Sequence, residues 1–226
     1  LLKSLSKKKK IVFIDCGANY GFYSLFVAGL SSRNKIISVE ASESTSRILK
    51  ENIELNSFKN ITPLNVALSN IDNQEVVFNE SVNDWESSIS HKNFKLSNQT
   101  SIFTKKLDSV IKDINILDEI LFIKLDIEGN EFSALKGAYQ IIQKFEPIII
   151  IEFSRFIFNS KNSEIFLSNF VDKFDYKIYN NKKVSVNQNE IFELIKNLDK
   201  KHNTIGNYFL IKNNSKKLNL FLETYE

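Results

Sequence analysis

Several carboxylates in this sequence stand directly after short apolar runs that are typical of buried strands. Asp15, Glu40, Asp126 and Glu152 each close such a run. In open sheets of alternating strands and helices, ligands bind outside the carboxyl ends of the strands. We therefore expect these four side chains to share one edge of a sheet. Carboxylates placed there can accept hydrogen bonds from a ligand or take up a proton during a reaction.

The first of these residues belongs to a stretch that reads as a strand, a tight turn and a helix, IVFIDCGANYGFYSLFVAGL at 11–30. Its leading apolar residues predict a central strand that is buried on both faces. Gly17 and Gly21 bracket the turn, and Gly17 allows a sharp bend with room for a ligand near the backbone. The helix that follows offers unpaired N–H groups at its start, which is typical of a nucleotide site.

A second strand at 35–39 ends in Glu40, at the distance expected of an acid that binds the two hydroxyls of a ribose. The turn has the form Asp-x-Gly-x-x-x-Gly and lacks the middle glycine that admits a pyrophosphate. Asp15 also places a negative charge where a phosphate would sit. A ligand with a ribose, an ammonium group and no phosphate fits these features, and S-adenosylmethionine is such a ligand.

Four blocks of the sequence resemble, in order, the motifs of the FkbM-type methyltransferases, a family of S-adenosylmethionine-dependent enzymes. They are DCGANYGFYS (15–24), NVALS (65–69), KLDIEGNEFSALKGA (124–138) and PIIIIEFS (147–154). The resemblance extends over residues 11–212. It implies an α/β, Rossmann-like class I methyltransferase fold with a seven-stranded, mostly parallel, doubly wound sheet. The implied strand order is 3-2-1-4-5-7-6, with the last strand antiparallel.

The resemblance also implies that S-adenosylmethionine is the cofactor and that O-methylation of a hydroxyl is the reaction. The acceptor would be a small molecule, a sugar or another glycan component. The expected cofactor-binding residues are Asp15, Gly17, Ala18, Asn19, Gly21, Glu40, Ala41, Ala67 and Asp126.

Two other functions stay open. Nucleic-acid N-methyltransferases usually carry Asn/Asp-Pro-Pro-aromatic after the fourth strand, where this chain has Asp126-Ile127-Glu128-Gly129. That difference counts against an amino-methylating enzyme. The other is a binding domain that keeps the fold and has lost the chemistry. Retention of Asp15, Gly17, Gly21 and Glu40 counts against it, although this retention shows only that a ligand could bind.

The transfer step needs alignment of the reactants, exclusion of water and a group that takes the acceptor's proton. Asp126, Glu128 and His91 are the candidate catalytic residues. Asp126 and Glu128 alternate along an extended segment, so we expect only one of them to face the pocket. Glu131 can instead favour a helix N-terminus, and Lys124 can be a counter-ion for one of the acids. We expect no metal, although carboxylates can bind magnesium, and two histidines with one cysteine argue against zinc.

With 226 residues and 42% hydrophobic content, the chain can bury one sizeable core. We expect a methyltransferase domain at 11–212, a basic lead-in at 1–10 and a tail at 213–226. The tail is either a solvated end or a partner-binding helix, and we favour the solvated end. The net charge of +3 does not indicate nucleic-acid binding, and no apolar run approaches the ~20 residues of a membrane span.

The single cysteine, Cys16, is typical of the reducing cytoplasm and is expected to pack in the core. No methionine occurs, even at position 1, which indicates a processed chain or a segment of a longer one.

Periodicity predicts the other elements. Helices are expected at 43–56 with Ser42 or Ser44 as N-cap, from 107 to before 118, at 131–145 with an interruption at Gly137, at 163–174 and at 190–200. Strands are expected at 64–68, 120–125, 148–151, 176–179 and 208–212. The extended stretches 75–78 and 101–105 can pair as a hairpin between the third and fourth strands. The polar segment 79–100, which contains Trp85, is expected to cover the acceptor site as a lid.

Overall fold

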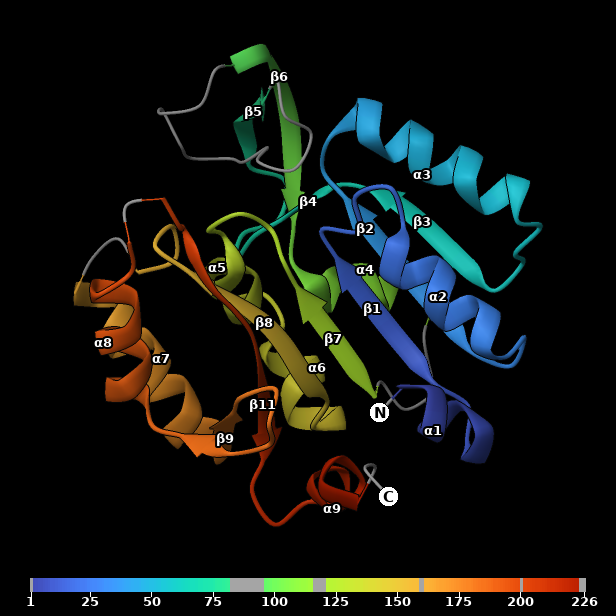
Figure 1. Cartoon of the computed structure of the whole chain (residues 1–226). Helices are drawn as coiled ribbons and strands as arrows, with labels where there is room; N and C mark the ends of the chain where they lie inside the picture. The colour runs from blue at the N-terminus through green and yellow to red at the C-terminus, as the bar shows by residue number, and fades with distance from the viewer. Residues whose placement is uncertain (1, 82–95, 116–120, 159–160, 200, 224–226) are drawn as a thin grey trace.

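One sheet of parallel strands, extended by antiparallel strands on one side, forms the centre of the molecule (Figure 1). The computed structural model describes residues 2–81, 96–115, 121–158, 161–199 and 201–223. The strands of this sheet are β1 (Val12–Cys16), β2 (Lys35–Glu40), β3 (Ile61–Asn65), β7 (Phe122–Leu125), β8 (Ile148–Ser154), β9 (Tyr176–Tyr179), β10 (Ser185–Val186) and β11 (Thr204–Lys212). Their spatial order is β10-β9-β11-β8-β7-β1-β2-β3. β11 pairs antiparallel with β8 and β9, whereas the strands from β8 to β3 are parallel.

Without β10, this order is the expected 3-2-1-4-5-7-6, so the Rossmann-like prediction is confirmed. β10 adds an edge strand of two residues that pairs antiparallel with β9. The chain runs from β1 outward through β2 to β3 and then returns to β7 on the other side of β1. The strand order therefore reverses beside β1, which is the position at which such sheets bind ligands.

Helices cover both faces of the sheet, and the alternation of side chains along β1 shows which helices cover each face. Phe13 packs in one cluster with α1 (Leu2–Lys8), α2 (Phe22–Leu30), α3 (Glu43–Leu55) and α9 (Lys216–Glu223). Val12 and Ile14 pack on the opposite face with α4 (Leu107–Asp113), α5 (Glu131–Lys136), α6 (Tyr139–Phe145), α7 (Lys161–Phe174) and α8 (Gln188–Lys196). No helix in the described part of the chain is long and apolar enough to cross a membrane.

α3 follows directly from its sequence. The Ser42 hydroxyl accepts a hydrogen bond from the Thr45 backbone N–H at 3.2 Å, which makes Ser42, and not Ser44, the N-cap. Leu49 and Ile53 are four residues apart and are both buried against the sheet. The expected helix at 43–56 is therefore confirmed, with its cap resolved.

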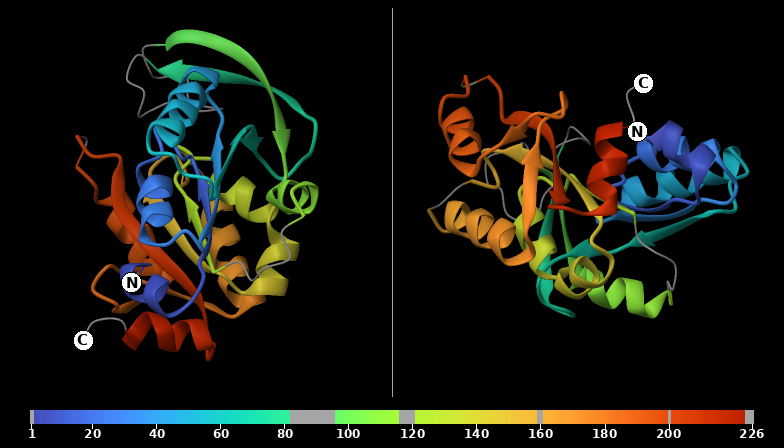
Figure 2. Two further views of the ribbon diagram at one scale, coloured as in Figure 1. Left: turned by 90° about the vertical axis from the view of Figure 1, so that its right-hand side faces the viewer. Right: turned by 90° about the horizontal axis from the view of Figure 1, so that it is seen from below.

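A hairpin projects beyond the carboxyl ends of the central parallel strands (Figures 1 and 2). It consists of β5 (Glu75–Ser81) and β6 (Leu96–Lys105), which pair antiparallel, and this confirms the predicted insertion. β4 (Ala67–Leu68) pairs with the end of β6 and completes a second, three-stranded sheet. Both chain ends lie at the opposite end of the molecule from the hairpin.

The prediction of one strand at 64–68 is wrong. β3 begins at Ile61, runs through Pro63 and ends at Asn65, while Ala67 and Leu68 pair with β6. A proline is tolerated in β3 because β3 is an edge strand of the sheet. The backbone N–H that proline lacks is not needed on the side of an edge strand that has no neighbouring strand.

Other boundaries also differ. The strand predicted at 148–151 continues to Ser154, and the strand predicted at 208–212 begins at Thr204, because the two pair antiparallel over this length. The helix predicted at 190–200 begins at Gln188, since Asn187 caps it, and ends at Lys196. The interruption of the helix at Gly137 is confirmed, because α5 ends at Lys136 and α6 begins at Tyr139.

The expectation of a solvated tail is wrong for residues 216–223. These residues form α9, and Phe221 is only 2% exposed. Its ring packs against the rings of Tyr179 and Phe209, at centroid distances of 5.6 and 5.0 Å. At the other end of the chain, Leu5 of α1 is fully buried in the same cluster. The alternation of apolar residues in these short segments is too brief to separate a helix from a polar terminus by pattern alone.

Candidate functional site

The glycine turn after β1 is tied to the strands on both sides. The backbone N–H groups of Gly17 and Ala18 donate to the Val39 carbonyl of β2, at 2.9 and 3.0 Å. On the β7 side, a Cβ atom at Gly17 would lie 1.8 Å from the Asp126 carbonyl oxygen. Gly17 also has φ of +77°, in the region that favours glycine. Contact with the Asp126 backbone, and not only access for a ligand, therefore requires glycine here.

Glu40 is fixed by the backbone around it. One carboxylate oxygen accepts from the Asn19 N–H at 2.8 Å, and the other accepts from the Ser42 N–H at 2.9 Å. Burial raises the pKa of Glu40, while backbone N–H groups, with that of Ser42 foremost, act in the opposite direction. The result is a carboxylate of fixed orientation whose remaining lone pairs can accept hydrogen bonds from two adjacent hydroxyls.

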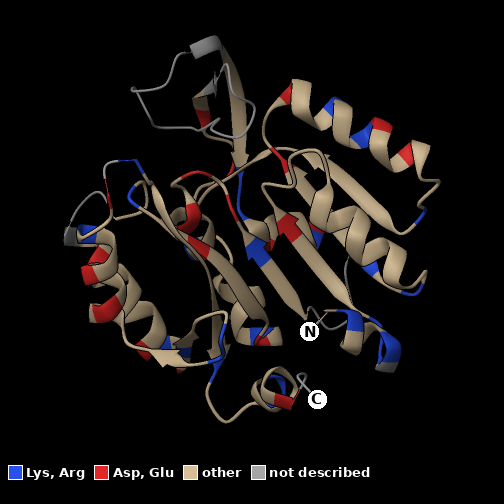
Figure 3. Ribbon diagram, in the orientation of Figure 1, with Lys and Arg blue, Asp and Glu red and all other residues tan. Residues whose placement is uncertain are grey.

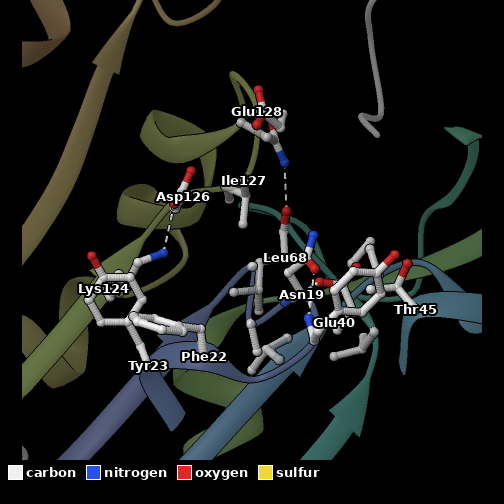
Figure 4. A pocket seen from close by; sticks show the side chains of 18 of the residues that line it. Asn19, Phe22, Tyr23, Glu40, Thr45, Leu68, Lys124, Asp126, Ile127 and Glu128 are labelled. Atoms are coloured by element: carbon white, nitrogen blue, oxygen red, sulfur yellow. Dashed lines mark hydrogen bonds and ion pairs between the residues drawn. The ribbon is translucent and has the colours of Figure 1, made fainter. Parts of the chain in front are cut away.

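A cavity of about 680 Å³ opens along this edge of the sheet (Figure 4). Seven of the nine predicted cofactor-binding residues line it, namely Gly17, Ala18, Asn19, Glu40, Ala41, Ala67 and Asp126. Side chains that the sequence did not single out for this role line it as well, among them Tyr23, Asn52, Phe78, Lys124 and Glu152. The cavity is large enough for a nucleoside with an amino-acid chain.

The other two predicted residues, Asp15 and Gly21, support the cavity without lining it. Asp15 is only 1% exposed, and its Oδ2 accepts from the Ser24 hydroxyl of α2 at 2.6 Å. Burial raises the pKa of Asp15, while the Lys124 charge and the Ser24 hydrogen bond lower it. Gly21 precedes α2, with φ of +93°. Both residues thus position the turn and helix that border the cavity.

Three carboxylates meet beside the end of β7 and the last three residues of β8, and Figure 3 shows acidic positions gathered there. Asp126, Glu128 and Glu152 each bring one oxygen to within 4.8 Å of the others. The register of the strands explains part of this arrangement, because Leu125 pairs with Ile151 and the next residues are Asp126 and Glu152. Burial and the neighbouring Asp126 charge raise the pKa of Glu152.

The expectation that only one of Asp126 and Glu128 faces the pocket is wrong, because both line the cavity. The extended segment ends at Leu125, and Glu128 has φ of +53°, so the chain turns and the strand alternation no longer applies. Three carboxylate oxygens at this spacing are also of the type that binds Mg²⁺ or Ca²⁺. One of them, however, already has a cationic partner.

That partner is Lys124, whose side chain is only 3% exposed. Its Nζ donates to Asp126 Oδ2 at 2.8 Å and lies 4.0 Å from Asp15 Oδ1 and 4.9 Å from the centroid of the Tyr23 ring (Figure 4). Burial lowers the pKa of Lys124, but the charges of Asp15 and Asp126 more than offset this and raise it. Lys124 therefore connects two acids of neighbouring strands and is not a counter-ion for one of them alone.

Glu131 holds the turn that carries these carboxylates. Its Oε1 accepts from the backbone N–H groups of Ile127 and Gly129, at 2.9 and 3.3 Å. It lies in the first turn of α5, as its predicted helix-terminal role requires, and it does not line the cavity. Burial raises the pKa of Glu131 to about 7.

Cys16 is buried, and burial raises the pKa of its thiol, which confirms a packing role.

Two predicted features cannot be placed in this geometry. His91 and Trp85 lie outside the described residues, as does most of the segment that we expect to act as a lid. A catalytic role for His91 stays a prediction.

The sheet order, the glycine turn after β1 and the acid that ends β2 together define a Rossmann-like methyltransferase fold. Comparison with protein families identifies residues 15–201 as a methyltransferase FkbM domain. The chain belongs to this family of S-adenosylmethionine-dependent methyltransferases. A comparison with curated proteins gives no match.

Solved structures of low sequence identity share the fold. Methyltransferase FkbM from Methylobacillus flagellatus KT is 20% identical with a TM-score of 0.54, and the match covers 88% of this chain but only 43% of that one. A proposed caffeoyl-CoA O-methyltransferase from Staphylococcus aureus is 12% identical with a TM-score of 0.51, over 94% of this chain and 81% of that one. A proposed methyltransferase from Streptococcus mutans, in complex with SAH, is 11% identical with a TM-score of 0.50, over 91% and 90%.

Proposed function

We propose that the cavity binds S-adenosylmethionine and that the protein transfers its methyl group to a hydroxyl of a small molecule, a sugar or a glycan component. The observation that carries this proposal is the distribution of acids along the cavity. Glu40 is held by two backbone N–H groups in one part of it, and Asp126, Glu128 and Glu152 gather in another. The first part suits a ribose, and the second can take up a proton.

The apolar lining next to Glu40 suits the adenine ring. Val66, Ala67 and Leu68 follow β3 and line the cavity together with Phe78 from the hairpin. The ribose hydroxyls would then donate to Glu40, and the amino-acid chain would extend toward the ends of β1 and β7. The middle position of the turn is Asn19 and not the glycine that lets the backbone approach a pyrophosphate. The turn therefore suits a ligand without a pyrophosphate.

S-adenosylmethionine supplies, when bound, a methyl group that is already activated by the positive charge of its sulfur. The chain's own residues must orient the acceptor hydroxyl in line with that methyl group and take its proton. We assign the proton to the carboxylates at the end of β7, with Glu128 nearer the acceptor and Asp126 nearer the cofactor. The oxygen–carbon bond forms as the carbon–sulfur bond breaks, and the carboxylate keeps the proton.

The structural neighbour from Streptococcus mutans in complex with SAH supports a cofactor of this type. The turn Asp126-Ile127-Glu128-Gly129 has no proline, which disfavours the amino-methylating alternative. A binding domain without catalysis would retain the Glu40 part of the cavity but would not need three acids near the end of β7.

The test has two stages. Calorimetry of the purified protein with S-adenosylmethionine and S-adenosylhomocysteine is expected to give saturable binding of both. A screen of hydroxylated acceptors with methyl-labelled S-adenosylmethionine is then expected to give a labelled ether. Binding without any transfer across sugars, polyketides and amine controls would favour the non-catalytic alternative, and label on amines alone would favour N-methylation.

A further inference from the structure

The charges that line the cavity are mostly of one sign. Among the described lining residues, Glu40, Asp126, Glu128 and Glu152 are acidic, and Lys124 alone is a lysine or arginine. S-adenosylmethionine carries two positive groups, the sulfonium and the ammonium, and one negative group, the carboxylate of its amino-acid end. A cavity that binds this cofactor is expected to offer that carboxylate a donor, and within the described part of the lining the charged donor is Lys124.

Lys124 and Asp126 are arranged so that both can reach a ligand. The ammonium of Lys124 has three N–H donors, and Asp126 Oδ2 takes one of them at 2.8 Å. Asp15 Oδ1 is 4.0 Å away, which is beyond hydrogen-bonding distance. The side chain of Asp126 is 32% exposed, and its carboxylate also interacts with the neighbouring side chain of Glu152. An ammonium and a carboxylate therefore stand side by side at the cavity wall, as Figure 4 shows.

We propose that Lys124 and Asp126 bind the amino-acid end of S-adenosylmethionine as a complementary pair. The Nζ of Lys124 donates to the cofactor's carboxylate, and Asp126 accepts from its ammonium. This assignment rests on the proposed function, and it adds Lys124 as the residue that recognises the carboxylate. It also leaves Glu128 and Glu152 as the acids that face the acceptor.

The surroundings of Lys124 hold its ammonium in place. Lys124 of β7 pairs in register with Asp15 of β1, and Asp15 is itself fixed by the Ser24 hydroxyl. The Tyr23 ring, which also lines the cavity, packs against the ammonium at 4.9 Å. The raised pKa of Lys124 keeps the side chain charged at neutral pH. A buried cation that is held from behind and lies in a cavity wall is suited to bind an anionic group.

The alternative is that Lys124 only neutralises Asp15 and Asp126 and never contacts the ligand. The two roles differ in their response to the ligand's carboxylate, so a ligand without that group separates them. Calorimetry of the wild-type protein compares S-adenosylhomocysteine with its decarboxylated form, the 3-aminopropyl thioether of adenosine. We expect the decarboxylated ligand to bind roughly 10- to 100-fold more weakly, as loss of a hydrogen bond between charged groups predicts.

The variant Lys124→Met then tests the residue. We expect it to weaken S-adenosylhomocysteine by a similar factor and to leave the decarboxylated ligand nearly unchanged, so that the preference disappears. Lys217→Met is the matched control, because Lys217 is also a buried lysine but lies on α9 and donates to the Phe145 carbonyl. This control is expected to keep the wild-type preference.

Each outcome decides the matter. Equal affinity of the wild type for both ligands would overturn the assignment even if Lys124→Met fails to fold. An equal loss of both ligands in Lys124→Met, with the preference retained, would overturn it in favour of a structural role. A wild type that binds neither ligand would instead overturn the proposed cofactor, and the assignment of Lys124 with it.

Discussion

Gly17 packs so closely on Asp126 that a Cβ atom at Gly17 would lie 1.8 Å from the Asp126 carbonyl oxygen. The contact joins the turn after β1, which borders the part of the cavity that contains Glu40, to the turn after β7, which carries Asp126 and Glu128. Any displacement of one turn therefore displaces the other.

Gly17→Ala should destabilise the fold more than a change of backbone preference alone. The left-handed conformation costs a non-glycine residue about 1–2 kcal/mol, and the clash should add roughly 1–3 kcal/mol. Gly206→Ala is the matched control, because Gly206 has φ of +89° but nothing within 4 Å of its Cβ position. Chemical denaturation measures both, and equal losses would show that contact with Asp126 is unimportant.

Glu40→Ala should weaken binding of S-adenosylmethionine by about 1–3 kcal/mol, because the ribose hydroxyls lose a charged acceptor. Glu43→Ala is the control, since Glu43 lies in the first turn of α3 with its side chain 81% exposed. Calorimetry gives both affinities, and thermal melting verifies that each variant is folded. Unchanged affinity in Glu40→Ala would refute the placement of the ribose.

Isosteric variants should separate the roles of the carboxylates. Glu128→Gln is expected to lower turnover by about 10²–10⁴-fold with little change in S-adenosylhomocysteine affinity, because it removes the proposed proton acceptor. Asp126→Asn should act chiefly on the affinity, since we propose that Asp126 accepts from the cofactor's ammonium. The turnover rate is measured with an acceptor found in the screen described above, and calorimetry measures the affinity for S-adenosylhomocysteine. The reverse pattern would exchange the two roles.

Chelation should leave turnover unchanged. The three carboxylates could accept a divalent cation, but Asp126 is already paired with Lys124 at 2.8 Å, so we propose that they work without one. The assay compares turnover before and after incubation with EDTA. Activity that disappears and returns with magnesium would recast Asp126, Glu128 and Glu152 as metal ligands.

Glu131→Gln should change how stability depends on pH. The pKa of Glu131 is raised from 4.5 to about 7 in the folded protein, so the neutral form favours folding. The contribution of protonated Glu131 to the free energy of unfolding is roughly 3 kcal/mol. It is fully present below pH 4.5 and is lost as the pH rises through about 7. The glutamine variant keeps an acceptor oxygen and cannot ionise.

Denaturation of both proteins at pH 5 and pH 8 measures this linkage. The free energy of unfolding of Glu131→Gln, relative to that of the wild type, should be higher at pH 8 than at pH 5. Asp15 and Glu40 also have raised pKa values, but they are present in both proteins and cancel in the comparison. A difference that does not vary with pH would contradict the assignment to Glu131.

The elements that could be predicted from the sequence are those with a strong local pattern. The apolar run before Asp15 and the helical spacing of Leu49 and Ile53 identify β1 and α3 without knowledge of distant residues. The order of the central strands follows from the family resemblance and is confirmed. Seven of the nine expected cofactor-binding residues line one cavity, because the edge of a parallel sheet collects the residues that end its strands.

The features that were missed depend on contacts between distant residues or on unusual backbone conformations. Lys124 lies between two acids because β1 and β7 pair in a register that places Asp15 beside it, and nothing local to Lys124 indicates that pairing. Glu128 takes a positive φ although it is not glycine, so the strand alternation assumed for it fails. α9 owes its position to the packing of Phe221 on rings of β9 and β11.

The attachment of the hairpin has a consequence for how proteins of this kind can diversify. The chain leaves the central domain after Ala67 and Leu68 and returns at Thr104 and Lys105, and these two short segments pair with each other. An insert whose entry and exit are adjacent can be lengthened, shortened or exchanged without altering the order of the central strands. If this insert covers the acceptor, as we propose, selectivity for the acceptor can change by replacement of one contiguous segment, and Phe78 of β5 is a residue next to the proposed adenine position that such a replacement would also change.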